Sequence, residues 1–353
     1  PETHRDILDA HSELNKLFAK PVYTAADKIR MLALMDTLGI LNRDEGRFVW
    51  LRRIRGRLIT RPRSGARRIV ADGRDDWVGW LELKTGPVDE TAFQNTARVI
   101  AEANVDVLAL VEVESRPVML EFHDYIYQPV AADQYGPMML IDGNDARGID
   151  VGLMLRPGYR VASMLSHVDD RMPDGRPIFS RDCPEYTVEL PNGARVAVLP
   201  NHFKSKYGGN DARSRAKRRA QAEAVAGYYR RLRLMGQRFV AILGDLNDTP
   251  DSEELAPLYA TDLREVSDHP AFTAFQFDSS RGGRGIGTFQ TGSDGHKIDY
   301  IFLSPALWDR VTLGGMVRKG AWTASGRWDM FDPLKRPHHA ASDHHLIWVD
   351  IDL

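Results

Sequence analysis

AILGDLNDTP, residues 241–250, places a short apolar run directly before two aspartates, an asparagine and a proline. The apolar part predicts a buried strand, because short apolar runs ended by glycine and polar residues are typical of strands inside an α/β sheet. Asp245 and Asn247 follow at the point where that strand ends. Side chains at the end of a buried strand lie at the rim of a sheet, where α/β enzymes carry their active sites. This stretch therefore predicts an α/β fold with chemistry at its strand ends.

Four other stretches repeat this arrangement of an apolar strand beside ionisable groups. Along the chain they are LALVEVE (108–114), VLPNHFKSK (198–206), HKIDYIF (296–302) and ASDHH (341–345). Any one of them is equally compatible with an ion-paired strand end that has no catalytic role. Their occurrence together in one chain favours an active site built from several strands.

The order of strand-like and helix-like patterns divides the chain near residue 76. Residues 77–353 alternate between the two patterns, which is typical of a layered α/β domain. Strands are expected over 77–83, 105–113, 149–155, 187–190, 195–200, 239–243, 297–303 and 346–351, and helices over 89–103 and 212–235. Residues 1–76 form an extension, with helices expected over 6–18 and 25–38 before an irregular arginine-rich segment.

The composition excludes several classes of protein. Hydrophobic residues make up 43% of the chain, yet no apolar run approaches the roughly 20 residues that span a bilayer, so no membrane association is expected. Cys183 is the only cysteine, which rules out an intrachain disulfide and a cysteine-built zinc site. The polar segment 1–20 has no apolar core of the kind that a secretory signal needs, so we expect a cytoplasmic protein. A secretory signal peptide that has been removed stays as the alternative. No feature of the sequence indicates a protein partner.

The motifs at the strand ends resemble those of the endonuclease/exonuclease/phosphatase superfamily. The matching residues are Glu112, Gly244-Asp245-Leu246-Asn247, Asp299-Tyr300 and Ser342-Asp343-His344. The NHFKSK segment, residues 201–206, is similar to that of bacterial nucleases, including extracellular DNases. The resemblance covers residues 77–353. It implies a DNase I-like, four-layered α/β/β/α sandwich of two mixed sheets between helices, here with an N-terminal helical extension.

The resemblance also implies a divalent metal ion. Carboxylates suit Mg²⁺ or Mn²⁺, with Ca²⁺ as a further candidate, and we expect Glu82, Glu112 and Asp343 to be metal ligands. Members of the superfamily usually begin with a strand that ends in asparagine, whereas strand 77–83 has none. Glu82 is the expected substitute, because Asn95 lies inside a predicted helix and is better explained as a surface or structural residue.

The remaining matched residues fit the needs of phosphodiester cleavage, which are a countercharge for the phosphate, an activated water and a proton for the leaving oxygen. Asp245 is expected to orient or deprotonate the water, and Asn247 to donate its amide to a phosphate oxygen. Asp299 and His344 are interpreted as a carboxylate-imidazole pair in which the acid orients the ring and favours its charged form. His202 is the second imidazole, contacting the phosphate or protonating the leaving group.

Two basic runs raise the question of a polyanionic substrate, although the formal net charge of the chain is -2. The first run, residues 47–68, is better explained as a solvated face. The second follows NHFKSK and continues to Arg219, and it favours nucleic acid, with DNA first, as the substrate. The residues expected to bind substrate are Arg147, Lys204, Arg213 and Arg215.

The sequence supports a metal-dependent phosphodiester hydrolase, with a nuclease acting on DNA as the first hypothesis. The second is a phosphodiesterase or phosphatase for a small-molecule or lipid-derived phosphate, since one fold serves both kinds of substrate. A binding scaffold without catalysis is disfavoured, because the acids and histidines of the motifs are intact apart from the early asparagine. A zinc site of His338, His339, His344 and His345 is also disfavoured, because their spacing is irregular and no cysteine lies near.

Overall fold

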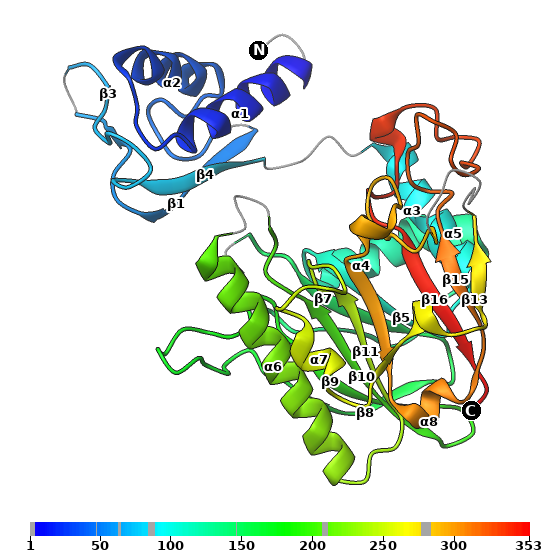
Figure 1. The fold of residues 1–353 in the computed structure, drawn as a ribbon. Coiled ribbons are helices and arrows are strands. Elements are labelled where there is room, and N and C mark those ends of the chain that lie inside the picture. Colours follow the sequence, from blue (N-terminus) through cyan, green and yellow to red (C-terminus); the bar gives the residue numbers. More distant parts are fainter. Residues whose placement is uncertain are drawn as a thin grey trace. The chain divides into compact units, whose positions relative to one another are not determined.

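The computed structural model describes residues 4–46, 48–62, 65–83, 89–145, 147–206, 211–276 and 284–353 (Figure 1). The chain forms two compact units, residues 1–88 and residues 89–353. Every strand-end motif quoted above lies in the second unit. Among the helices described, none is both long and apolar enough to cross a membrane.

The N-terminal unit combines two helices with two small antiparallel sheets. Its elements are α1 (His4–Phe18), α2 (Ala25–Thr37), β1 (Val49–Arg55), β2 (Ile59–Thr60), β3 (Arg68–Ile69) and β4 (Val78–Leu83). Both expected helices are confirmed, and α2 begins at a capping box formed by Thr24 and Asp27. β4 pairs with β1, and Trp77 is buried against Phe18, with ring centroids 4.8 Å apart. These contacts place β4 in the N-terminal unit, whereas the sequence pattern assigned residues 77–83 to the start of the catalytic domain.

A six-stranded mixed sheet forms the centre of the second unit. Its order is β12-β14-β11-β10-β9-β8, with β10 and β11 parallel and the other neighbours antiparallel. The strands are β8 (Arg160–Leu165), β9 (Glu185–Glu189), β10 (Arg195–His202), β11 (Val240–Asp245), β12 (Arg264–Glu265) and β14 (Asp299–Leu303). Because β14 runs against β10 and β11, its first residue meets their last residues at one edge of the sheet.

Two three-stranded sheets form the second β layer (Figure 1). One has the order β5-β7-β6 and the other the order β13-β15-β16. The strands are β5 (Val107–Val113), β6 (Met138–Leu140), β7 (Asp150–Leu155), β13 (Phe272–Phe275), β15 (Val311–Val317) and β16 (Leu346–Ile351). β7 is buried along its whole length, which is the expected state of a central strand in a middle layer.

Helices cover the outer faces of both β layers. On the six-stranded sheet they are α6 (Ala212–Leu234) and α7 (Ala256–Tyr259). On the second layer they are α3 (Glu90–Ala103), α4 (Arg116–Phe122), the π-helical turn His123–Tyr127 and α5 (Gln128–Ala131). Shorter pieces are α8 (Pro305–Trp308) and the 3₁₀ turns Val266–Asp268, Asp294–His296 and Pro337–His339. The expected four-layered α/β/β/α sandwich is therefore confirmed.

Alternating residues of β10 separate the two cores of this sandwich. Val196 and Val198 belong to the core between the β layers, whereas Ala197 and Leu199 pack with α6. This period of two is the geometry of a strand that is buried on both faces. The strand carries polar side chains only where it reaches the edge of the sheet, and its last residue is His202.

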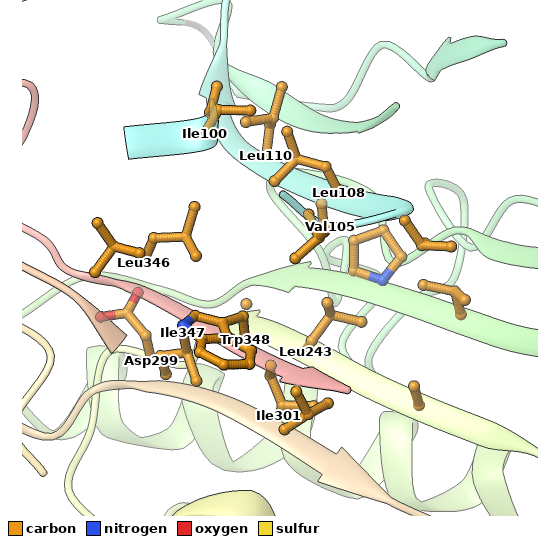
Figure 2. A pocket seen from close by; sticks show the side chains of 18 of the residues that line it. Ile100, Val105, Leu108, Leu110, Leu243, Asp299, Ile301, Leu346, Ile347 and Trp348 are labelled. Atoms are coloured by element: carbon orange, nitrogen blue, oxygen red, sulfur yellow. The ribbon is translucent and has the colours of Figure 1, made fainter. Parts of the chain in front are cut away.

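An apolar cavity of about 490 Å³ lies between β5 and β16 (Figure 2). These two strands are the edge strands of their sheets in the part of the chain that the structure describes. Leu108 and Leu110 of β5 line one side, and Ile347 and Trp348 of β16 line the other. Asp299 also lines the cavity, so the cavity reaches the edge of the six-stranded sheet where the motif residues lie.

Candidate active site

Three motif residues lie side by side in one row across the six-stranded sheet. His202 of β10 is opposite Asp245 of β11, and Asp245 is opposite Asp299 of β14. The Nε2 atom of His202 lies 3.6 Å from Oδ2 of Asp245. Each residue begins or ends its strand, so the apolar strands fix the backbone while the side chains project at the sheet edge.

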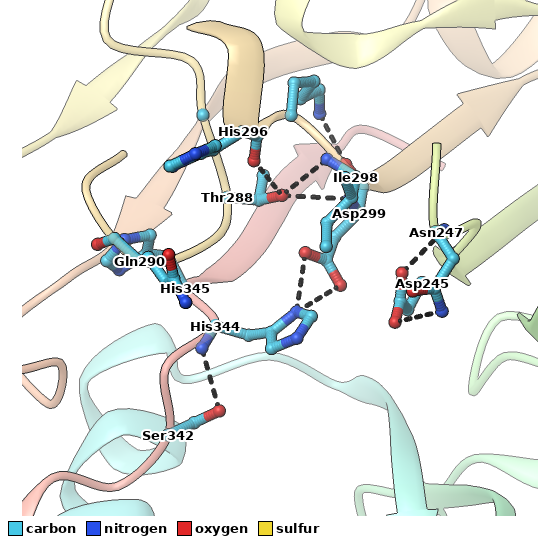
Figure 3. A network of polar contacts seen from close by, with 12 residues as sticks. Asp245, Asn247, Thr288, Gln290, His296, Ile298, Asp299, Ser342, His344 and His345 are labelled. Atoms are coloured by element: carbon cyan, nitrogen blue, oxygen red, sulfur yellow. Dashed lines mark hydrogen bonds and ion pairs between the residues drawn. The ribbon is translucent and has the colours of Figure 1, made fainter. Parts of the chain in front are cut away.

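His344 joins this row from the loop before β16 (Figure 3). Its Nδ1 atom lies 3.1 Å from Oδ1 and 2.9 Å from Oδ2 of Asp299. The backbone of Asp299 is fixed by Thr288, whose buried hydroxyl accepts a hydrogen bond from the Asp299 N–H at 2.9 Å. One ligand atom from each of Asp245, Asp299 and His344 lies within 4.8 Å of the others. The predicted carboxylate-imidazole pair is thus formed in the structure.

Asn247 faces Asp245 across a tight turn. Its backbone N–H donates to Oδ1 of Asp245 at 2.8 Å, and its side-chain amide donates to Oδ2 at 2.8 Å (Figure 3). The turn requires glycine at position 244, where φ is +127° and a Cβ atom would lie 2.0 Å from the carbonyl oxygen of Asn201. The contact of Asn247 with a phosphate oxygen stays a prediction, while its contact with Asp245 positions that carboxylate.

Glu112 is turned out of its strand by a β-bulge. Val111 pairs with Val151 and Val113 with Asp150, which leaves Glu112 as the extra residue, with a φ of 60°. Asn247 has the same left-handed backbone, with a φ of 55°. Such conformations cost about 1 to 3 kcal/mol in residues other than glycine, and they concentrate at functional sites. Glu112 is exposed, and its negative charge contributes to raising the pKa of Asp245.

The charges in the row favour opposite states for its two histidines. Burial, together with the charges of Arg181 and Arg147, lowers the pKa of His202 to about 3. Burial alone would also lower the pKa of His344, but the hydrogen bond and the charge of Asp299 outweigh it and raise this pKa to about 9. His202 is therefore neutral and His344 protonated near neutral pH. A neutral His202 fits a hydrogen-bonding role better than the protonation of a leaving group.

The carboxylates of this site fit a divalent cation. Burial and the neighbouring charge of Asp299 raise the pKa of Asp245, which is the signature of two acids held together without enough countercharge. Oxygen ligands from such a pair suit Mg²⁺ or Mn²⁺. Glu112 adds a third carboxylate close enough to influence Asp245. Asp343 is exposed and lies outside the three-residue cluster, so its role as a ligand stays a prediction.

Arg181 supplies a buried positive charge beside the row. Its side chain is 2% exposed, and its Nε atom lies 3.0 Å from Oδ2 of Asp145, which also pairs with Arg147 at 3.0 Å. The side chain is buried because the loop that carries Arg181 folds inward. Nη2 of Arg181 is buried without a hydrogen-bond partner among the described residues. No spacing rule marks an arginine in such a loop, so its burial beside the row could not be predicted from a sequence pattern.

Two lysines add positive charge next to Arg181. Lys204 donates to the backbone oxygen of Ser205 at 3.0 Å, and Lys217 of α6 donates to Oγ of Ser180 at 2.9 Å. Burial, followed by the charge of Arg181, lowers the pKa of both lysines. Lys204 was expected to bind substrate, whereas Lys217 was not singled out because it lies within a generally basic run.

Most other cations of the second basic run are paired with acids. Asp248 binds both Lys206, at 2.5 Å, and the fully buried Arg218, at 2.8 Å. Nε of Arg215 lies 3.6 Å from Oε1 of Glu254. Arg213 is exposed near the start of α6. The binding roles of Arg213 and Arg215 stay predictions, and the ion pairs reduce the charge that this run offers to a substrate.

Glu82 and Asn95 were the two residues considered for the position of the usual asparagine. Glu82 lies in β4 of the N-terminal unit, where its carboxylate pairs with Arg52, and its role as a metal ligand stays a prediction. Asn95 is fully buried in α3 and donates to the backbone oxygen of His339 at 2.8 Å. Of the two interpretations of Asn95, a surface residue or a structural contact, the structure therefore shows the structural contact.

A family model described as the endonuclease/exonuclease/phosphatase family matches residues 89–321. The chain belongs to this family. The matched residues include Glu112, His202, Asp245 and Asp299, and the match ends before His344, which the structure brings to the same site. The family contains phosphodiesterases and phosphatases, and its enzymes generally use divalent metal ions.

Solved structures of family members share this fold. A mannosyl-6-phosphatase from Bacteroides thetaiotaomicron is 14% identical, with a TM-score of 0.51 over 74% of this chain and 91% of that one. The human nocturnin catalytic domain with bound sulfate is 15% identical, with a TM-score of 0.50 over 75% of this chain and 87% of that one. At such low identity the likeness shows the fold alone. A search of curated proteins gave no match.

Proposed function

We propose that this protein is a divalent-metal-dependent phosphodiester hydrolase that acts on nucleic acid, with DNA as the first candidate. The observation that carries the proposal is the row His202, Asp245 and Asp299, completed by His344 at 2.9 Å from Asp299. This row combines neighbouring carboxylates with one neutral and one protonated imidazole. Phosphodiester cleavage needs these groups to orient a water, contact the phosphate and supply a proton.

The role proposed for each residue is based on its contacts in the structure. Asp245 and Glu112 would hold a divalent ion, which when bound supplies positive charge to the phosphate and favours ionisation of a water. Asn247 holds the carboxylate of Asp245, which orients or deprotonates the attacking water. His202, being neutral, donates a hydrogen bond to a phosphate oxygen. Asp299 orients the protonated His344, which faces the leaving oxygen and can donate its proton to it.

Positive charge around the row supports a substrate with several phosphates. Arg181 and Arg147 lie close enough to the row and to Lys204 that their charges lower the pKa of both His202 and Lys204. A single phosphoester needs only the catalytic centre, whereas a polymer places further phosphates on each side of the bond that is cut. These cations are suited to binding those flanking phosphates.

The apolar cavity between β5 and β16 favours a second candidate function. Its lining includes Asp245, Asp299 and His344 together with apolar side chains such as Leu108 and Trp348. A phosphoester with an apolar substituent could place its phosphate at the row and its substituent in the cavity. The second candidate is therefore a phosphodiesterase or phosphatase for a lipid-derived or other small phosphate.

One substrate panel tests both candidates. The purified full chain would be assayed with duplex DNA, single-stranded DNA, RNA, bis-p-nitrophenyl phosphate, a phosphomonoester and a phospholipid, each with Mg²⁺, Mn²⁺ or EDTA. We expect cleavage of nucleic acid with either metal and loss of cleavage in EDTA. Undiminished turnover after exhaustive chelation would overturn the metal dependence. Hydrolysis of the small or lipid esters alone, with every nucleic acid left intact, would replace the first candidate by the second.

A further inference from the structure

The four histidines near the C-terminus separate into three environments. His344 pairs with Asp299, and His345 is buried with its ring 4.9 Å from that of Trp328. His338 and His339 lie together in a 3₁₀ turn that packs on α3. The four therefore do not form one site, and the last two are not used by the proposed chemistry.

Asp89 completes a second cluster with these two histidines. One ring nitrogen from each of His338 and His339 and one carboxylate oxygen of Asp89 lie within 4.8 Å of one another. Oδ2 of Asp89 is 3.7 Å from Nε2 of His338, and the two rings are perpendicular, with centroids 4.6 Å apart. Ligands about 2.1 Å from a tetrahedral zinc ion are about 3.4 Å apart, so small side-chain rotations would suffice to close the site.

The surrounding contacts hold the cluster in place. The other carboxylate oxygen of Asp89 caps α3 by accepting from the N–H of Ala92 at 3.2 Å. The backbone of His339 is fixed by the buried Asn95, and its Nδ1 atom lies 3.2 Å from the carbonyl oxygen of Pro333. The backbone nitrogen of Lys335 lies 3.3 Å from the same Nδ1 atom, so backbone groups hold this ring in one orientation, as they do for imidazoles that bind metals. The ligands thus come from two segments that are already fixed to each other.

The ligand set distinguishes this cluster from the catalytic row. Two imidazoles and one carboxylate suit zinc and similar transition metals, whereas Mg²⁺ prefers oxygen ligands. Three protein ligands leave a coordination position for water. The side chain of His338 is 61% exposed, so an ion can enter from solvent.

We propose that Asp89, His338 and His339 bind a zinc-type divalent ion at a site separate from the catalytic row. The ion would join the start of α3 to the 3₁₀ turn Pro337–His339. His339 lies three residues before Ser342, which is the first residue of the motif Ser342-Asp343-His344. With water as its fourth ligand, the ion would link these two segments and so hold the segment that carries His344. The inference does not depend on the proposed substrate.

Calorimetric titration of the metal-stripped full chain with Zn²⁺, in excess Mg²⁺ to occupy the oxygen-rich row, tests the site. The variants are His338→Gln, His339→Gln and Asp89→Asn, with His296→Gln as the matched control outside both clusters. We expect the wild type and the control to bind one equivalent of Zn²⁺. The three variants should bind Zn²⁺ at least tenfold more weakly. Zn²⁺ should also raise the melting temperature of the wild type but not of His338→Gln.

Two outcomes would overturn the inference. One is a wild type that binds no Zn²⁺ under these conditions. The other is a set of variants whose isotherms match that of the wild type, which would place the ion elsewhere. Because His338 is exposed, His338→Gln is expected to fold, and circular dichroism would verify this. Hydrolysis of phosphodiesters with Mg²⁺ alone should persist in His338→Gln, so failure of the proposed function and failure of this site are distinguishable.

Discussion

Nδ1 of His344 lies 2.9 Å from Oδ2 of Asp299, which joins the loop before β16 to the first residue of β14. The carboxylate fixes the ring through one nitrogen and raises the pKa of His344 to about 9. The other nitrogen, Nε2, then carries a proton that can be donated to a substrate. The two residues are therefore expected to act as one unit.

Removing either member of this pair should lower turnover. We expect His344→Ala to reduce kcat by a factor on the order of 10², because an acid-base group is lost, and Asp299→Asn to reduce it by a smaller factor. The double variant should lose little more than His344→Ala, since the aspartate acts through the imidazole. Steady-state kinetics on a minimal phosphodiester would measure this coupling, and fully multiplicative losses would show that the two act independently.

Arg181 should matter more for activity than its position in a loop suggests. We expect Arg181→Met to lower kcat/KM for a phosphodiester roughly tenfold or more, because a buried cation next to the row stabilises the negative charge of the phosphate. Arg176→Ala is the matched control, since Arg176 lies in the same loop, half exposed and paired with Asp174. Equal kinetics for the two variants would make Arg181 a structural residue, and melting curves would separate a folding defect from a catalytic one.

The sequence predicted that His202, Asp245 and Asp299 lie at strand ends, because each residue stands next to the apolar run that forms its strand. His202 and Asp245 follow an apolar run within three residues and Asp299 precedes one, and a run of that kind becomes a buried strand. Parallel and antiparallel pairing then brings the ends together at one edge. The alternation of strand and helix patterns predicted a layered α/β domain, whereas the four layers followed from the family resemblance.

Contacts between distant segments were not predictable in this way. Arg181 is buried because its loop folds against the row, and Asp89 meets His338 because a late turn packs on an early helix. Neither contact leaves a periodic pattern in the chain. The strand Trp77–Leu83 was recognised as a strand from its apolar residues, but its partner β1 is arginine-rich, and that pairing could not be read from the sequence.

Acid should destabilise the second unit partly through His345. Burial, followed by the charges of Arg318 and His344, lowers the pKa of His345 to about 3, whereas the unfolded value is about 6.5. Between these values the unfolded chain binds more protons, so stability falls as the pH drops below about 6.5. His202 contributes in the same direction. Each group adds a slope of up to about 1.4 kcal/mol per pH unit.

Denaturant unfolding of the metal-free protein between pH 7 and pH 4 would measure this slope. We expect His345→Gln to show a shallower loss of stability than the wild type, because the substituted side chain does not titrate. His11→Gln, in the N-terminal unit, serves as the control and should leave the slope of the second unit unchanged. A slope in His345→Gln equal to that of the wild type would mean that the buried imidazole does not govern acid unfolding.

The salt dependence of DNA binding should identify which cations contact the phosphates. Binding weakens with salt by a slope of about 0.9 for each phosphate neutralised on duplex DNA. We expect the double variant Lys204→Gln/Lys217→Gln to bind more weakly and to lower this slope by roughly 1 to 2. Arg215→Gln/Arg219→Gln should change it little, because these arginines already pair with Glu254 and Glu223. If the arginine variant instead flattens the slope, the ion pairs on α6 open on binding, and the DNA follows that helix as the sequence pattern predicted.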